Sequence, residues 1–234
     1  MPRDDDWERA ESTTPRSGKL YRQIRFESPR GATEIVLVRH GESENADPDR
    51  PFPLVAGRGD PALSALGREQ AELVAARLAT TLVDAIYVTG LRRTAETAAP
   101  LAERLGLSPQ VEADLAEVRL GAWEGGLYRK RISERDPLAA QLFEQERWDL
   151  IPGAETNEAL ADRVGRAVNR IAAAHTGGRV VCYAHGGTIG TALAIAAGSR
   201  PFAFIGSDNG AISTIVVAGS RWLVRGFNDH AHLE

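Results

Sequence analysis

The chain has 234 residues, of which 43% are apolar and 26% charged, as is usual for a globular protein of one large or two small domains. Its formal net charge of −4, from 28 Lys and Arg against 32 Asp and Glu, argues against a nucleic-acid-binding protein. The single cysteine, Cys182, excludes an intrachain disulfide, and no apolar run approaches the roughly 18 residues of a membrane span, so we predict a cytoplasmic protein that does not bind membranes.

The first 31 residues are polar, contain scattered prolines and lack the apolar core of a signal peptide. We predict that residues 1–31 form a mobile N-terminal arm and that a single domain occupies residues 32–234. Some apolar side chains of the arm are candidates for contacts with the domain or with a partner, namely Leu20, Tyr21, Ile24 and Phe26.

The stretch of residues 34–41 is the centre of the prediction. Its apolar, β-branched run indicates a buried parallel strand that ends in Arg39, His40 and Gly41. Ligands of an open α/β sheet bind beyond the carboxyl ends of the strands, so Arg39 and His40 are predicted to lie at a binding site. Gly41 is expected to let the backbone approach a ligand closely. The long loop that follows, residues 42–60, is typical of a functional segment.

The chain then alternates between predicted helices and strands. The expected elements of the first half are a helix capped by Ser64, a strand over residues 82–88, a helix over residues 91–106 and a short strand over residues 110–112. The first of these helices carries an apolar face of Leu66, Leu73, Val74 and Leu78. Residues 114–126 are rich in glycine and are predicted to be irregular.

The second half of the chain continues the same alternation. Its expected elements are helical residues 129–148 interrupted at Pro137, a helix from Thr156, a strand over residues 179–184, a helix to Ala197, and a hairpin of residues 211–218 and 221–225. The helix from Thr156 places Leu160, Val164, Ala167, Val168 and Ile171 on one apolar face. The pattern predicts one α/β domain whose mainly parallel central sheet is flanked by helices on both faces.

Two predicted strands end in histidine, at His40 and His185, and a glycine follows each. Parallel strands place their carboxyl ends at one edge of a sheet, so the two imidazoles should converge although they are 145 residues apart (185 − 40). Metal binding is one alternative, because imidazole is the commonest metal ligand. Nearby arginines, Arg39, Arg92 and Arg93, would instead repel a cation and suit a phosphate.

An imidazole among arginines can attack phosphorus as a nucleophile. The arginines would stabilise the charge that spreads over the equatorial oxygens in the transition state. The leaving alkoxide needs a proton from an acidic side chain, and Glu117, in the irregular segment, is the best-placed carboxyl group.

In these residues the chain resembles the histidine phosphatase superfamily, in the branch that includes the cofactor-dependent phosphoglycerate mutases and the small broad-specificity phosphatases. The resemblance runs from about Thr33 to Phe227. Four motifs carry it: Arg39-His40-Gly41-Glu42 with Asn45, the segment from Thr89 to Ala98, Leu115-Ala116-Glu117 with Gly121-Ala122-Trp123-Glu124-Gly125, and His185-Gly186-Gly187-Thr188-Ile189. Departures from the common family residues occur at Thr89, Gly90, Thr94, Glu96 and Gly190 and leave the pocket shape and substrate preference open.

The resemblance implies that His40 is the nucleophile that becomes phosphohistidine, and that Glu117 protonates the leaving group and later activates water. It also implies a set of phosphate or substrate ligands, namely Arg39, Asn45, Arg58, Arg93, His185 and Gly186. Arg93, not Arg92, is the implied phosphate ligand. We expect a small anionic phosphomonoester as the substrate and neither a metal nor another cofactor. His40 must be neutral to attack, whereas His185 would gain from positive charge, so activity at mildly acidic to neutral pH is expected.

Mutases of this family carry an extra stretch between the acid and the second histidine that encloses the substrate and limits water. Here the interval is 68 residues (185 − 117), which favours the shorter phosphatase form. A 2,3-bisphosphoglycerate-dependent phosphoglycerate mutase and a non-catalytic phosphoester-binding protein are the alternatives.

The segment of residues 121–148 contains several aromatic and basic side chains, and it is either a surface helix with core aromatics or a basic, aromatic rim of the pocket. The polar arm and the final hairpin could support a homodimer.

Overall fold

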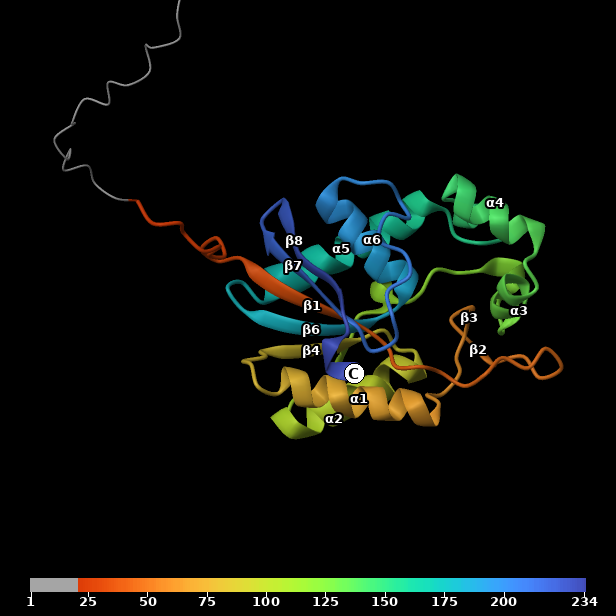
Figure 1. Cartoon of the computed structure of the whole chain (residues 1–234), viewed down its shortest axis with the longest axis horizontal. Helices are drawn as coiled ribbons and strands as arrows, with labels where there is room; N and C mark the ends of the chain where they lie inside the picture. The colour runs from red at the N-terminus through yellow and green to blue at the C-terminus, as the bar shows by residue number, and fades with distance from the viewer. Residues whose placement is uncertain (1–20) are drawn as a thin grey trace, which may run out of the picture.

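The computed structural model describes residues 21–234 (Figure 1). The predicted mobility of the arm and the predicted contact of Leu20 therefore fall, for residues 1–20, outside the described part of the chain. Residues 21–31 are exposed and form no helix or strand. Phe26 nevertheless contacts the domain, because the guanidinium carbon of Arg225 lies 3.7 Å from the centroid of its ring.

The described chain alternates between strands and helices, as the sequence pattern predicts. The elements are β1 (Thr33–Arg39), β2 (Leu54–Val55), β3 (Arg58–Gly59), α1 (Ala65–Leu78), β4 (Ala85–Val88), α2 (Arg92–Leu105), β5 (Gln110–Val111), α3 (Leu127–Ser133), α4 (Pro137–Gln145), α5 (Asn157–Ala174), β6 (Arg179–Ala184), α6 (Gly186–Ala197), β7 (Ile212–Ala218) and β8 (Arg221–Asp229). Short 3₁₀ turns cover Ala113–Leu115, Gly121–Trp123, Trp148–Leu150 and Ala231–Leu233.

The central sheet has six strands in the order β5-β4-β6-β1-β7-β8. The strands from β5 to β1 run parallel, and β7 and β8 are antiparallel additions at the other side of β1. Helices α1 and α2 cover one face of this sheet, and α5 and α6 cover the other (Figure 1). The predicted α/β fold with a mainly parallel sheet is therefore confirmed.

The side chains of β1 alternate between two separate cores. Ile35 and Leu37 join the core beneath α5 and α6, whereas Val36 and Val38 join the core beneath α1 and α2. All four are fully buried. This explains the continuous apolar run of the strand, because neither face of β1 meets solvent.

The helix boundaries follow their predicted signals. The Ser64 hydroxyl accepts a hydrogen bond from Gly67 N at the start of α1, and Thr156 caps α5 in the same way through Ala159 N. Pro137 opens α4, where its missing N–H has no cost. Gly106 ends α2 in the left-handed conformation that favours glycine.

Three local predictions differ from the structure. Leu66 and Leu73 are exposed on α1, because the buried side of this helix consists mainly of small residues that allow close packing. Leu82 is also exposed, and strand β4 begins only at Ala85. The predicted loop of residues 42–60 contains the hairpin β2–β3, which lies near α3 (Figure 1).

Gly41 and Gly67 form a backbone contact between the end of β1 and the first turn of α1. A Cβ atom on Gly41 would lie 2.3 Å from the carbonyl oxygen of Gly67, and a Cβ on Gly67 would lie 1.9 Å from the carbonyl oxygen of Glu42. Gly41 is therefore required by its contact with α1, and the predicted close approach of the backbone to a ligand stays a prediction.

Candidate active site

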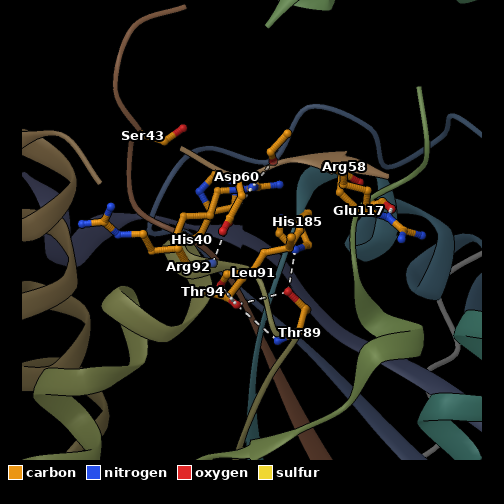
Figure 2. Close-up of polar contacts among 12 residues, drawn as sticks. His40, Ser43, Arg58, Asp60, Thr89, Leu91, Arg92, Thr94, Glu117 and His185 are labelled. Atoms are coloured by element: carbon orange, nitrogen blue, oxygen red, sulfur yellow. Dashed lines mark hydrogen bonds and ion pairs between the residues drawn. The ribbon is translucent and has the colours of Figure 1, made fainter. Parts of the chain in front are cut away.

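The two histidines converge at the carboxyl ends of adjacent parallel strands. His40 follows β1, His185 follows β6, and these strands pair in register. The ring centroids are 5.1 Å apart with an edge-on interplanar angle of 62°. The exposed fractions are 6% for His40 and 0% for His185. Figure 2 shows both side chains in one cluster with Glu117 and Arg58 nearby.

The hydrogen bonds of His40 fix its tautomer. Nδ1 lies 2.7 Å from the carbonyl oxygen of Gly41, which can only accept, so Nδ1 carries the proton. Arg93 Nε donates to His40 Nε2 over 3.2 Å, so Nε2 carries the lone pair. The side-chain amide of Asn209, a residue that the sequence analysis missed, donates to the His40 carbonyl oxygen over 2.8 Å. The lone pair required for nucleophilic attack is thus on Nε2.

A chain of hydroxyl groups sets the tautomer of His185 (Figure 2). The Thr94 hydroxyl donates to the Leu91 carbonyl oxygen at 2.7 Å and therefore accepts from the Thr89 hydroxyl at 3.1 Å. Thr89 Oγ1 in turn accepts from His185 Nε2 at 2.9 Å. His185 Nδ1 then carries the lone pair; it is buried and has no hydrogen-bond partner among residues 21–234.

Two departures from the common family residues have structural consequences. Thr89 provides the hydroxyl that contacts His185. At Gly190 a Cβ atom would lie 2.9 Å from the carbonyl oxygen of Phe204, so a larger residue would require this loop to shift.

Arg93 is buried beside the histidines, where its Nη1 donates to the Gly59 carbonyl oxygen at 2.9 Å and lies 3.9 Å from Asp60 Oδ1. Arg92 instead points to the surface and pairs with Glu96 at 2.5 Å. The geometry therefore favours Arg93 over Arg92 as the phosphate ligand.

The other predicted arginines also lie at the site. Arg39 donates through Nη1 to the Ser207 carbonyl oxygen, and its buried Nε has no hydrogen-bond partner among the described residues. Arg58 extends from β3 and donates to the carbonyl oxygen of Glu117. Burial is the main cause that lowers the pKa of Arg39 and Arg58 from the usual arginine value, yet both remain cationic at neutral pH.

Glu117 lies in the acid-bearing loop (residues 112–120), and its carboxylate faces the first turn of α6. Its Oε1 accepts from Val118 N at 2.9 Å, and its Oε2 accepts from Gly187 N at 3.3 Å, two residues after His185. A Cβ on Gly187 would lie 2.7 Å from Glu117 Oε1, so the glycine leaves room for the carboxylate. The predicted acid and the second histidine are thus held at the same helix terminus.

A cavity of about 160 Å³ opens in front of His40. Its lining includes Glu117, Glu124 and four arginines, Arg39, Arg58, Arg93 and Arg129. Phe52, Trp123 and Tyr128 contribute an aromatic wall. Burial, followed by the charge of Glu117, raises the pKa of Tyr128 to about 12, so its hydroxyl stays protonated.

The remaining predicted ligands border this cavity. Asn45 lines an adjoining polar recess that also includes Arg39, His40 and Arg129. Gly186, the first residue of α6, lies against Arg39, since a Cβ there would be 3.6 Å from Arg39 Nε.

The segment of residues 121–148 divides between rim and core. Arg129 lines the cavity and donates to the Ser43 hydroxyl at 2.6 Å and to the Glu44 carbonyl oxygen at 2.7 Å. Arg131 instead pairs with Asp136 at 3.0 Å. Trp148 packs in the core, with its ring centroid 4.9 Å from that of Phe202. Both interpretations of this segment are therefore correct for part of it.

Burial and neighbouring arginines lower the pKa of both histidines well below the usual value. For His40, burial is the first cause, followed by the charges of Arg93 and Arg39. For His185, burial again comes first, followed by Arg93 and His40. Both imidazoles are neutral at neutral pH in the free protein. This agrees with a nucleophilic His40, and it contradicts a charged His185 before the anionic substrate binds.

The same shifts predict that the protein loses stability in mild acid. When the pKa of a histidine is depressed in the folded state, the unfolded chain binds the proton at a higher pH than the folded protein does. The stability that the neutral histidine contributes is therefore fully present above about pH 6.5 and is lost as the pH falls below that value. Two such groups should lower the free energy of unfolding by up to about 2.7 kcal/mol per pH unit. Urea titrations between pH 7.5 and 5.5 measure this slope.

The control replaces one histidine at a time. His185→Gln should remove about half of the slope. Equal slopes in the parent protein and in His185→Gln would contradict the assignment.

Within residues 21–234, no group of three or more His, Cys, Asp and Glu side chains is arranged to hold a metal ion. Over the same residues, no helix combines the length and the apolar character that crossing a membrane requires.

Comparison with known proteins agrees with this geometry. The family model of the histidine phosphatase superfamily (branch 1) matches residues 35–230. The chain is 32% identical to the metal-independent phosphoserine phosphatase of Arabidopsis thaliana, over 93% of this chain and 90% of that protein. It is 34% identical to phosphoglycerate mutase-like protein 4 of the same plant, over 86% of this chain and 87% of that protein.

The fold is similar to that of solved phosphatases. The native structure of a mycobacterial glucosyl-3-phosphoglycerate phosphatase superposes with a TM-score of 0.71 at 28% identity. The match covers 83% of this chain and 98% of that chain.

Proposed function

Because this chain belongs to branch 1 of the histidine phosphatase superfamily, we propose that it is a metal-independent phosphomonoester hydrolase that acts through a phosphohistidine on His40. The observation that carries this proposal is the lone pair of His40 Nε2, which points at Arg93 in a buried cluster with His185. A neutral imidazole surrounded by arginines can attack a phosphoryl group that the same arginines hold in place.

In the first step, His40 Nε2 attacks phosphorus and the bond from phosphorus to the ester oxygen breaks. Glu117 acts as the general acid and gives a proton to the leaving alkoxide. Nδ1 of His40 keeps its proton and donates it in a hydrogen bond to the Gly41 carbonyl oxygen. This bond holds the ring in place as Nε2 becomes phosphorylated. The Glu117 carboxylate lies beside α6 and borders the cavity in front of His40, so it can reach the leaving oxygen.

In the second step, water attacks phosphorus and the bond to Nε2 breaks. Glu117, now a carboxylate, takes the proton from the water, which restores the starting state and releases inorganic phosphate. Arg39, Arg93 and the N–H group of Gly186 at the start of α6 bind the phosphoryl oxygens in both steps. Their fixed positive charge supplies the stabilisation that a metal ion provides in other phosphatases.

The substrate we propose is a small anionic phosphomonoester. The cavity is small and its lining includes two arginines beyond the pair assigned to phosphate. The Arabidopsis relative is named for phosphoserine, which makes phosphoserine the first substrate to assay. Cytoplasmic residence and a homodimer stay predictions, which cell fractionation and sedimentation can test.

The function is tested by hydrolysis of p-nitrophenyl phosphate and phosphoserine with enzyme dialysed against EDTA. We expect full activity and a trapped phosphoenzyme that is labile to acid and stable to alkali. Activity that disappears with EDTA and returns with Mg²⁺ would overturn the proposal. Dependence on 2,3-bisphosphoglycerate, with interconversion of phosphoglycerates instead of phosphate release, would favour the mutase alternative.

Arg129→Ala is expected to raise KM for phosphoserine about tenfold and to change kcat less than about threefold. The reason is that Arg129 lines the cavity while its own hydrogen bonds go to Ser43 and Glu44, so its charge acts mainly on binding. Steady-state kinetics measure both constants.

Arg131→Ala is the matched control, because this arginine leaves the same helix, α3, and pairs with Asp136. It should leave KM and kcat unchanged. Equal effects of the two substitutions would remove Arg129 from the substrate site.

A further inference from the structure

Arg163 is a buried arginine of α5 that the mechanism above does not use. Its exposed fraction is 7%, and it lies among the apolar side chains Leu160, Val164 and Ala167 of that helix. A guanidinium group has five N–H donors, and burying any of them without an acceptor is costly. The positions of the five acceptors therefore show what this side chain holds.

All five donors of Arg163 have partners, and three of them are carbonyl oxygens of the acid-bearing loop. Nη1 donates to the Asp114 carbonyl oxygen at 2.7 Å and to the Ala116 carbonyl oxygen at 2.6 Å. Nη2 donates to the Glu117 carbonyl oxygen at 3.0 Å. The remaining two bonds go to Glu155, from Nε at 2.7 Å and from Nη2 at 2.9 Å.

Glu155 fixes the guanidinium and the far end of the same loop. Its exposed fraction is 5%. Its carboxylate also accepts from Arg119 N at 3.3 Å, and its own N–H donates to the Arg119 carbonyl oxygen at 2.9 Å. Burial alone would raise the pKa of Glu155, but the hydrogen bonds and charge of Arg163 outweigh this and lower it. The pair is therefore ionic, and it holds the loop on both sides of Glu117.

The opposite side of the loop is held by α6. The Thr188 hydroxyl donates to the Ala116 carbonyl oxygen at 2.9 Å, and Gly187 N donates to the Glu117 carboxylate. The carboxylate position therefore depends on two helices, α5 through the Arg163–Glu155 pair and α6 through its first turn. Arg58 of β3 also donates to the Glu117 carbonyl oxygen, but the Arg163–Glu155 pair binds the loop on both sides of Glu117.

We propose that Arg163 and Glu155 are positioning residues for the catalytic acid, and that they hold the Glu117 carboxyl group at the leaving-group oxygen. This inference rests on the proposed function, in which Glu117 is the proton donor. A buried ion pair is weak evidence for a gain in stability, because apolar side chains of similar volume often serve as well. Its five directed hydrogen bonds specify a geometry, and a lysine with three donors cannot reproduce them.

The test uses the leaving group to separate positioning from general stability. Phosphoenzyme formation is measured in single turnovers with p-nitrophenyl phosphate, whose leaving group needs little protonation, and with phosphoserine, whose alkoxide needs a proton. Arg163→Lys should slow the reaction with phosphoserine at least about thirtyfold and that with p-nitrophenyl phosphate less than about threefold, since general acid catalysis contributes about 10²- to 10⁴-fold. A substitution that only destabilises the protein would lower the rates with both substrates by the same factor.

Two further variants keep the test decisive. Glu155→Gln retains the shape of the side chain and should show the same selective loss, even where Arg163→Lys fails to fold. Arg166→Lys is the matched control, because Arg166 also lies on α5 but is exposed and borders a recess that contains no residue of the acid-bearing loop. It should leave both rates unchanged.

Glu117→Gln provides the reference for the acid itself. A selective loss in Glu117→Gln without one in Arg163→Lys and Glu155→Gln would overturn the positioning role and leave the proposed function intact. The absence of selectivity in Glu117→Gln would instead show that the acid assignment is wrong, and the positioning role would fail with it.

Discussion

Replacing His40 with alanine is expected to lower kcat for p-nitrophenyl phosphate at least about 10⁴-fold, because the covalent route is lost with the nucleophile. Arg39 and Arg93 would still bind the phosphoryl group, so KM should change much less than kcat. Water cannot replace the imidazole as the nucleophile, because Arg93 orients Nε2 of His40, and not a water molecule, within the buried cluster. Initial rates over a range of enzyme concentrations measure the loss.

The phosphoenzyme provides a second measurement on the same variant. Radiolabel from the substrate should remain on the parent protein after rapid quenching and should be absent from His40→Ala. His230→Ala is the control for a histidine outside the site, at a half-exposed position near the C-terminus, and it should keep full activity. Activity of His40→Ala within tenfold of the parent would refute the assignment of the nucleophile.

Gly67→Ala is expected to lower the free energy of unfolding by at least about 3 kcal/mol, because the added carbon meets backbone that cannot rotate away. The nearest atom would be the Glu42 carbonyl oxygen at 1.9 Å. This clash can be relieved only if α1 moves away from the segment after His40, so activity should fall together with stability. Urea denaturation, followed by the tryptophan fluorescence, measures the change.

Gly165→Ala is the matched substitution in another helix. Gly165 lies in α5, and a Cβ there would meet no atom within 4 Å. This variant should be more stable than the parent by about 0.5–1 kcal/mol, because alanine favours the helix. If Gly67→Ala changed the free energy of unfolding as little as a substitution at an ordinary helical glycine, the contact between α1 and β1 would be looser than the structure describes.

The sequence predicts the sheet and the convergence of its strand ends because both follow from local patterns. The apolar run of β1 indicates burial on both faces, and parallel pairing then brings His40 and His185 together without further information. The helix caps at Ser64 and Thr156 are equally local. The loops are less predictable, and the hairpin β2–β3 has no sequence pattern of its own because each strand has only two residues.

The hydrogen bonds that hold the acid-bearing loop cannot be predicted from local sequence patterns. Most partners of Arg163 are backbone carbonyl oxygens, which have no residue signature, so the sequence cannot name them. A signal for the arginine itself does exist, since it interrupts the apolar face between Leu160 and Val164. The sequence also does not predict the neutral state of His185, because the lowered pKa depends on how completely the surrounding side chains exclude water.

The position of β1 in the sheet has a consequence for biosynthesis. Among the strands of residues 21–234, this one leaves the ribosome first, yet its two neighbours, β6 and β7, are made only in the last quarter of the chain. Pairing across such long sequence separations is slow, because a long loop must be closed before any contact compensates for it. The apolar strand β1 therefore stays without its sheet partners through most of translation, and chaperone binding to the nascent chain should be strongest over this strand.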